Sequence, residues 1–180
     1  MKTLLHVCCG PCAEWPITAL REGLVGFFYN PNIHPAEEHA RRLENAERFA
    51  ALRGLPLEVD VSYDEAPFRA RMEDPCVPGD GTASPRCRMC YALRLDAAAR
   101  KAVEQGADSF TTSLLVSPYQ DREALLEIGR EAGSRHGVTF LEEDFRGGYR
   151  DGQRMAREDG LYRQKYCGCI ASISQSGPVR

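Results

Sequence analysis

Seven of the eight cysteines of this 180-residue chain fall into three tight groups: Cys8, Cys9 and Cys12; Cys87 and Cys90; Cys167 and Cys169. Thiols separated by zero to two residues can readily ligate one metal centre, whereas most such pairs would strain a structural disulfide. The groups lie near the start, the middle and the end of the chain. A metal or redox centre that used all three would therefore hold the whole fold around itself, and thiolate chemistry is the predicted core of the function.

Four of these thiols are candidates for a single centre. Cys87 and Cys90 have the Cys-x-x-Cys spacing of iron–sulfur and zinc sites, and Cys8 and Cys9 would complete a set of four. Adjacent cysteines in a strand-like segment point in different directions, which suits the several iron corners of a cubane better than one zinc ion. The pattern favours a [4Fe–4S] cluster, with a structural zinc that pins the central loop as the alternative.

The remaining grouped thiols, Cys12, Cys167 and Cys169, allow two interpretations. They bind a second metal beside the cluster, or Cys167 and Cys169 cycle between dithiol and disulfide. A Cys-x-Cys disulfide closes a small strained ring that is easily reduced, which suits a catalytic pair and not a staple. Cys76 stands alone in a proline-rich stretch and is left out of the predicted site.

Length and composition indicate one globular catalytic domain over residues 1–180, with 170–180 as a short tail. Hydrophobic residues make up 43% and charged residues 27% of the chain, and no apolar run approaches the ~20 residues of a membrane helix. The short apolar N-terminus is typical of a first strand and not of a signal peptide, so we expect a cytoplasmic protein with reduced thiols. The net charge of −3 does not suggest a general nucleic-acid binder, although it leaves room for a local basic patch.

Strands and helices are expected to alternate along the chain. The predicted strands are 2–7, 24–29, 56–61, 109–116 and 138–142, and the predicted helices are 13–21, 35–53, 90–105 and 121–134. A long loop is expected over 67–85, and a helix broken at glycines is expected from 143 to about 166. We therefore expect a single-domain α/β fold with a parallel sheet of about five strands. It is Rossmann-like, of the adenine nucleotide α-hydrolase (HUP-like) type, with a cysteine-containing helical excursion.

In such sheets the ligand site lies beyond the carboxyl ends of the strands. The first cysteine group follows the first strand, and segments 117–120 and 144–146 follow the last two, so three loops should line one crevice. His34, Tyr119 and Asp144 are candidate catalytic proton donors there. Each also has an ordinary structural reading: His34 could cap its helix, Tyr119 could pack, and Asp144 could pair with Arg146.

Six motifs occur in order along the chain: LLHVCCGPC at 4–12, YNPNIHP at 29–35, CRMCYALRL at 87–95, TTSLLVSPYQ at 111–120, DFR at 144–146 and YRQKYCGC at 162–169. Together they resemble the QueH type of epoxyqueuosine reductase over nearly the whole chain. Several motifs in the right order are far more specific than any one of them.

The resemblance implies an oxidoreductase that reduces epoxyqueuosine to queuosine at the wobble position of certain transfer RNAs, the last step of queuosine biosynthesis. It implies a [4Fe–4S] cluster on Cys8, Cys9, Cys87 and Cys90, together with an adjacent iron, a redox-active Cys167–Cys169 pair, or both. Some relatives carry aspartate where this chain has Cys12, and a thiolate there would soften a second metal site. The resemblance names no electron donor.

A transfer RNA substrate also requires a cationic surface. The expected RNA-binding residues are Arg146, Arg150, Arg154 and Arg157, which crowd the C-terminal segment and would contact phosphates. A solvated helix face is the alternative reading of this charge.

Two rival functions are a non-enzymatic zinc-thiolate module that binds RNA, and an ATP-dependent tRNA-modifying enzyme of the PP-loop class. A loop that cradles pyrophosphate normally needs serine and several glycines. Here Pro11 stands in the loop and lacks an amide hydrogen, which counts against nucleotide binding.

Overall fold

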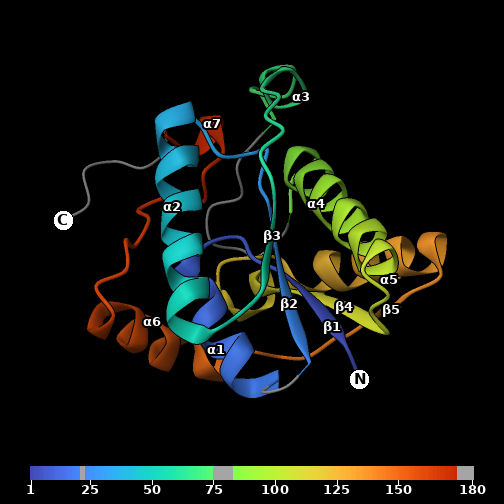
Figure 1. Cartoon of the computed structure of the whole chain (residues 1–180). Coiled ribbons are helices and arrows are strands. Elements are labelled where there is room, and N and C mark those ends of the chain that lie inside the picture. Colours follow the sequence, from blue (N-terminus) through green and yellow to red (C-terminus); the bar gives the residue numbers. More distant parts are fainter. Residues whose placement is uncertain (21–22, 75–82, 174–180) are drawn as a thin grey trace.

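Five parallel strands form one sheet at the centre of the protein (Figure 1). The computed structural model describes residues 1–20, 23–74 and 83–173. The strand order is β3-β2-β1-β4-β5, and the strands are β1 (Thr3–His6), β2 (Leu24–Tyr29), β3 (Leu57–Asp60), β4 (Ser109–Thr112) and β5 (Thr139–Phe140). All four neighbouring pairs are parallel. The predicted α/β fold with a five-stranded parallel sheet is confirmed.

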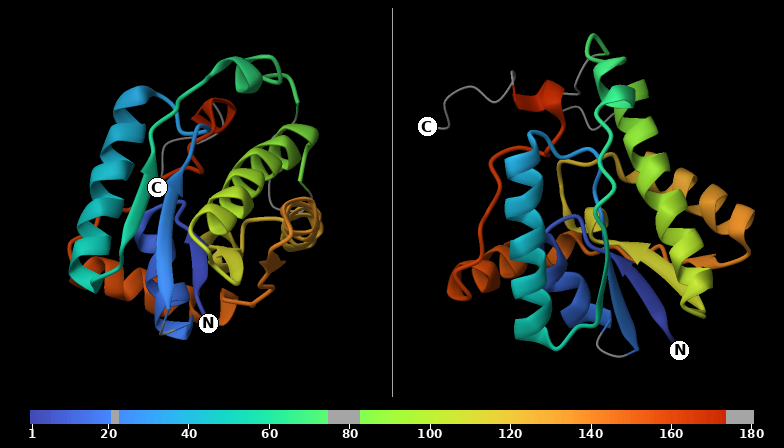
Figure 2. Two further views of the ribbon diagram at one scale, coloured as in Figure 1. Left: turned by 45° about the vertical axis from the view of Figure 1, so that its right-hand side comes forward. Right: turned by 45° about the horizontal axis from the view of Figure 1, so that its top comes forward.

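Helices cover both faces of this sheet. One face carries α1 (Gly10–Leu20), α2 (Ala36–Arg53) and α6 (Tyr149–Glu158), and the other carries α4 (Pro85–Glu104) and α5 (Arg122–His136). Both views of Figure 2 keep these two sets of helices apart. The short helices α3 (Ala66–Arg69) and α7 (Ile170–Ile173) lie beyond the carboxyl ends of the strands (Figure 1). Within the described residues, no helix is long and apolar enough to cross a membrane.

The period-two alternation of the strands divides the core between the two faces. In β1, Leu4 packs into the cluster under α4 and α5, whereas Leu5 packs into the cluster under α1, α2 and α6. In β2, Phe27 and Phe28 divide in the same way. All four side chains are almost fully buried. The sheet is therefore well packed on both faces, and the loops at its carboxyl ends extend from this core.

A close contact between α1 and the start of α6 depends on a glycine. A Cβ atom added at Gly148 would overlap the indole ring of Trp15, whereas one added at Gly147 would meet nothing within 4 Å. We expect Gly148→Ala to destabilise the protein by about 1–3 kcal/mol, because the indole must move out of a packed interface. Urea unfolding of this variant beside Gly147→Ala measures the effect, and equal midpoints for the two variants would contradict it.

The first cysteine loop is more helical than predicted. Helix α1 begins at Gly10 instead of residue 13, so Cys12 lies in its first turn. The Cys9 sulfur accepts a hydrogen bond from the Cys12 backbone N–H at 3.3 Å, in the manner of an N-cap. Pro11 fits the first turn because a backbone N–H at this position would have no partner within the helix, so nothing is lost by its absence.

The second cysteine pair is also placed on a helix. We predicted a helix from residue 90, but α4 begins at Pro85, and the Ser84 side chain caps it by accepting from the Cys87 backbone N–H at 3.2 Å. Serine at the N-cap followed by proline is a typical start of a helix, and the prediction of a loop over 67–85 did not take it into account. Part of that predicted loop, 75–82 with Cys76, falls outside the described residues.

The last two predicted strands are shorter than expected. The strand predicted over 109–116 ends at Thr112, whose hydroxyl accepts from the Leu114 N–H and starts a 3-10 turn, η1 (Ser113–Val116). The strand predicted over 138–142 pairs only through β5. The predicted break at the glycine pair before residue 149 is confirmed by a 3-10 turn, η2 (Arg146–Gly148), ahead of α6. Of the predicted tail, 170–173 forms α7, and 174–180 lies outside the described residues.

Candidate metal centre

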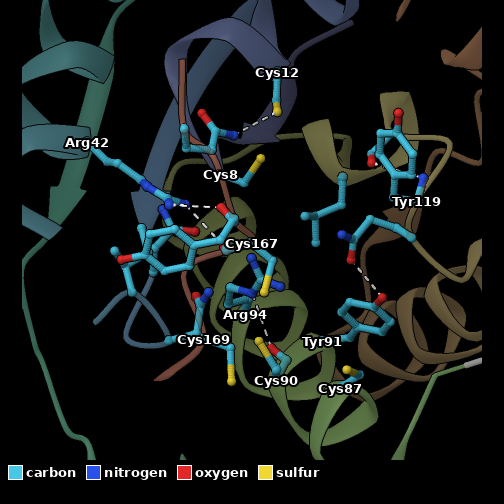
Figure 3. Close-up of a pocket in the computed structure, with 18 of the residues that line it drawn as sticks. Cys8, Cys12, Arg42, Cys87, Cys90, Tyr91, Arg94, Tyr119, Cys167 and Cys169 are labelled. Carbon is cyan, nitrogen blue, oxygen red and sulfur yellow. Dashed lines mark hydrogen bonds between the residues drawn. The ribbon is translucent and has the colours of Figure 1, made fainter. Parts of the chain in front are cut away.

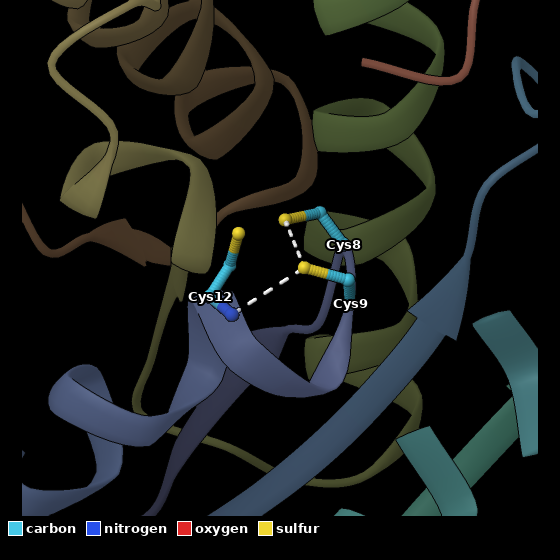
Figure 4. A group of neighbouring side chains, drawn as sticks. All are labelled: Cys8, Cys9 and Cys12. Carbon is cyan, nitrogen blue, oxygen red and sulfur yellow. Dashed lines mark hydrogen bonds between the residues drawn. The ribbon is translucent and has the colours of Figure 1, made fainter. Parts of the chain in front are cut away.

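The three cysteine groups meet at one cavity beyond the carboxyl ends of the strands. The cavity has a volume of about 360 Å³, and the cysteines that line it are Cys8, Cys12, Cys87, Cys90, Cys167 and Cys169. Figure 3 shows their side chains around this common space. The remaining grouped cysteine, Cys9, has its sulfur 3.9 Å from that of Cys8 (Figure 4). Residues from the start, middle and end of the chain are thus brought together.

The first group is compact enough to hold a single metal ion. The sulfur atoms of Cys8, Cys9 and Cys12 all lie within 4.8 Å of one another (Figure 4). A cubane instead distributes its thiolates over separate irons, so its ligands stand wider apart. Cys87 and Cys90 of α4 line the same cavity as the first group. In number and chemical type, these thiols fit the ligand set of an iron–sulfur cluster with a metal ion beside it.

Hydrogen bonds make the thiols of the first group unequal. Cys8 is held at both ends by Ser113 of η1, whose Oγ donates to the Cys8 sulfur at 3.2 Å and accepts from its N–H at 2.9 Å. Hydrogen bonds from Cys12 and Cys9 hold the pKa of the Cys8 thiol well below its usual range. Hydrogen bonding to Cys8 raises the pKa of Cys12, and burial raises that of Cys9. The three thiols of this loop therefore differ in acidity, and Cys8 is the most acidic of them.

Helix α4 places a buried cation beside the thiols. Arg94 follows Cys90 by four residues and Cys87 by seven, so all three share one face of the helix. Its side chain lines the cavity at 5% exposure, and its Nε donates to the Cys90 carbonyl at 3.3 Å. Figure 3 shows Arg94 close to Cys90 and Cys167. In the part of the chain that the structure describes, no carboxylate pairs with Arg94.

The third cysteine group is held by a glycine turn and by α2. Gly168 has φ +108°, and a Cβ there would press on Ile33 and Arg42. Arg42 donates to the Cys167 carbonyl at 3.1 Å. The Cys167 thiol is exposed and lies 3.1 Å from the Ser172 hydroxyl, whereas Cys169 is buried. Both are free thiols in the structure.

The structure separates the three predicted proton donors. Tyr119 lines the cavity, is 78% exposed, and meets the Tyr149 ring edge-on at 6.1 Å between centroids. His34 is buried outside the cavity wall, where it contacts Tyr63 and where burial lowers its pKa. Asp144 also lies outside the wall, bound to Arg146, whose hydrogen bonds hold the pKa of that carboxylate at about 2. Of the three, only Tyr119 lines the cavity, although the His34 backbone N–H donates to the Gly168 carbonyl between Cys167 and Cys169 at 2.8 Å.

The four arginines predicted to bind RNA are all exposed, and two of them are paired with acids. Arg146 binds Asp144, and Arg154 bridges two carboxylates of its own helix. Arg150 and Arg157 have no carboxylate partner among the described residues. Two further basic residues of the same C-terminal segment, the exposed Arg163 and Lys165, line the cavity directly.

Sequence reasoning missed three polar side chains of the cavity: the buried Asn32 and Arg42, and the partly buried Gln164. Arg94 was visible from the sequence beside the second cysteine group, and its spacing from Cys87 and Cys90 on a helix puts it on the thiol face. Gln164 stands in the motif that ends in Cys167 and Cys169. Asn32 and Arg42 had no local signal, because each reaches the cavity only through tertiary packing.

Comparison with known proteins identifies relatives along the whole chain. The family model described as epoxyqueuosine reductase QueH matches residues 3–175. The epoxyqueuosine reductase QueH of Thermotoga maritima is 36% identical over 174 residues, covering 94% of this chain and 89% of the relative. That of Staphylococcus aureus is 31% identical over 185 residues, covering 98% and 77%. That of Helicobacter pylori is 37% identical over 178 residues, covering 92% of this chain and 48% of the relative, so the chain spans about half of that protein.

A solved structure shares the fold. The U34-tRNA thiolase NcsA from Methanococcus maripaludis, solved with its [4Fe-4S] cluster, superposes with a TM-score of 0.56 at 15% sequence identity. The match covers 98% of this chain and 63% of that protein. At this identity the likeness concerns the fold alone, and it agrees with the parallel α/β architecture described above.

Proposed function

The chain belongs to the QueH family of epoxyqueuosine reductases, which are oxidoreductases, and on that premise we propose that it reduces epoxyqueuosine to queuosine at the wobble position of transfer RNA. This is the last step of queuosine biosynthesis. The observation that carries the proposal is the convergence of all three cysteine groups on one cavity. Because transfer RNA is modified in the cytoplasm, we place the protein there.

We propose that Cys8, Cys9, Cys87 and Cys90 hold a [4Fe–4S] cluster. A cluster with four thiolate ligands is an anion, and the buried cation of Arg94 supplies the complementary charge on the same wall. The other grouped thiols are Cys12, Cys167 and Cys169; they hold a second iron beside the cluster, or the last two form a redox-active disulfide. An iron–sulfur centre bound here supplies electrons one at a time together with Lewis acidity.

The side chains of the cavity would bind the modified base and deliver a proton. Conversion of an epoxide to an alkene releases the oxygen as water and consumes two electrons and two protons. Tyr119 is the proton donor best supported by its position, since its ring stands at the cavity beside Tyr149. The same two rings offer stacking surfaces for an unpaired base. His34 and Asp144 stay predictions and have no contact with the cavity.

We expect the double variant Arg150→Ala, Arg154→Ala to bind transfer RNA more weakly. Each lost phosphate contact should also flatten the dependence of log Kd on log salt by about one unit. The matched control is Arg135→Ala, an exposed arginine at the far end of α5 that is paired with Asp96. Binding titrations at several salt concentrations measure both slopes, and an unchanged slope for the double variant would remove α6 from the RNA surface.

The direct test is anaerobic reconstitution with iron and sulfide, followed by turnover of transfer RNA that carries epoxyqueuosine. We expect a brown protein with absorption near ~400 nm and formation of queuosine when a low-potential reductant is supplied. A colourless protein that contains only zinc and still binds RNA would instead support the zinc-thiolate module. A reaction that requires ATP would support the PP-loop alternative.

A further inference from the structure

Gln164 reaches from the C-terminal segment to the first cysteine group. Its side-chain Nε2 lies 2.9 Å from the Cys9 sulfur and 3.5 Å from the Cys12 sulfur. The amide donates to both sulfurs, with the closer contact to Cys9, and Gln164 is partly buried and lines the cavity. One side chain thus donates to two of the clustered sulfurs from a segment more than 150 residues away.

Helix α2 fixes the backbone on both sides of Gln164. Asn45 pairs with both backbone groups of Tyr162, accepting from its N–H at 2.8 Å and donating to its carbonyl at 3.1 Å. Arg42 donates to the carbonyls of Tyr166 and Cys167 at 2.9 and 3.1 Å. Both α2 side chains are buried. The segment is therefore held at each end, and the position of the Gln164 amide is a built feature of the fold.

The orientation of the amide is also informative. With its N–H groups on the sulfurs, the Gln164 carbonyl oxygen is buried and finds no partner among the described residues. The opposite orientation would direct a carbonyl oxygen at the lone pairs of Cys9 and Cys12. The cost of an unsatisfied amide carbonyl is offset when the N–H groups of the same amide donate to atoms that carry negative charge, as metal-bound thiolates do.

We propose that Gln164 is a positioning residue that raises the reduction potential of the iron–sulfur centre by donating hydrogen bonds to the Cys9 and Cys12 sulfurs. Reduction adds negative charge that spreads onto the ligand sulfurs, so a donor at those atoms stabilises the reduced state more than the oxidised state. The inference rests on the proposed function only in that these cysteines hold iron.

The test compares Gln164→Met with Gln153→Met in the anaerobically reconstituted protein. Methionine has nearly the length of glutamine but cannot donate. Gln153 of α6 lines the same cavity, and its described contacts include no hydrogen bond to a cysteine. Iron content and the midpoint potential are measured by iron analysis and by a redox titration followed by electron paramagnetic resonance. We expect a more negative midpoint for Gln164→Met, with wild-type iron content, and an unchanged midpoint for Gln153→Met.

Gln164→Glu provides a second variant of nearly the same shape, and it should shift the midpoint in the same direction because a carboxylate replaces the donor. A wild-type midpoint in both Gln164 variants would overturn the proposal, as would an equal shift in Gln153→Met. Loss of iron from both Gln164 variants would also overturn it, since the residue would then be needed for assembly. A shifted midpoint in a protein that does not turn over epoxyqueuosine would refute the proposed function and leave this inference standing.

Discussion

Cys87→Ser is expected to abolish both the iron–sulfur absorption and the turnover of epoxyqueuosine, with activity falling by more than ~100-fold. Cys87 lies in the first turn of α4, where the Ser84 cap fixes its backbone and the cavity lies directly in front of its side chain. A serine there keeps the helix and the shape but replaces a soft thiolate with a hard oxygen that binds iron–sulfur centres poorly. Visible spectra, iron analysis and turnover of the reconstituted variant measure the loss.

Cys76→Ser is the matched control, because Cys76 is the one cysteine outside the three groups. It should keep the wild-type spectrum and rate. Retained turnover in Cys87→Ser would remove α4 from the metal centre. Equal losses in both variants would show that the chemistry does not distinguish the grouped cysteines from the isolated one.

Removal of the iron–sulfur centre is expected to lower the free energy of unfolding by at least ~3 kcal/mol, because it takes the counter-ion away from a buried charge. Arg94 is 5% exposed and has no carboxylate partner among the described residues, so stripping the cavity leaves this cation without a balancing anion. The cross-link between the first cysteine group and α4 is lost in the same step. Anaerobic urea unfolding of the loaded and the stripped protein gives the difference directly.

The Arg94→Leu variant separates two contributions to this loss of stability: the unbalanced charge of Arg94 and the lost cross-link. The leucine variant should lose less stability when stripped, because its empty cavity contains no unpaired cation. Arg135→Leu, which changes an exposed arginine on α5, should behave like the wild type. Equal losses in wild type and Arg94→Leu would mean that Arg94 is satisfied without the metal centre.

The elements that were predicted well depend on local rules. Helix α2 ends where expected because Gly54 adopts the left-handed conformation that closes a helix. The strands β1 and β2 were predicted because both are short apolar runs bounded by turns. The boundaries that were wrong depend on single side-chain caps. Cys9 and Ser84 start their helices earlier than the hydrophobic pattern indicates, and Thr112 ends a strand in the middle of an apolar run.

At the site, the types of the residues and their spacing along the sequence can be read locally. Their arrangement in space cannot, because it depends on how distant segments pack. Sequence spacing was sufficient to identify the three cysteine groups and the parallel sheet whose strand ends would hold them. The surroundings of the cysteines are supplied by distant segments: Arg42 of α2 donates to the Cys167 carbonyl, and Gln164 donates to the Cys9 sulfur. Such contacts join segments more than 100 residues apart, and no local propensity encodes them.

The sequence by itself determined that this protein carries clustered thiols on an α/β sheet, because thiol spacing and strand–helix alternation are properties of neighbouring residues. The tertiary structure alone decided which polar groups surround those thiols, and that Tyr119 lines their cavity while His34 and Asp144 do not. The physical reason is that burial, charge and hydrogen bonding at an atom depend on everything packed around it, and most of what surrounds this cavity comes from distant parts of the chain.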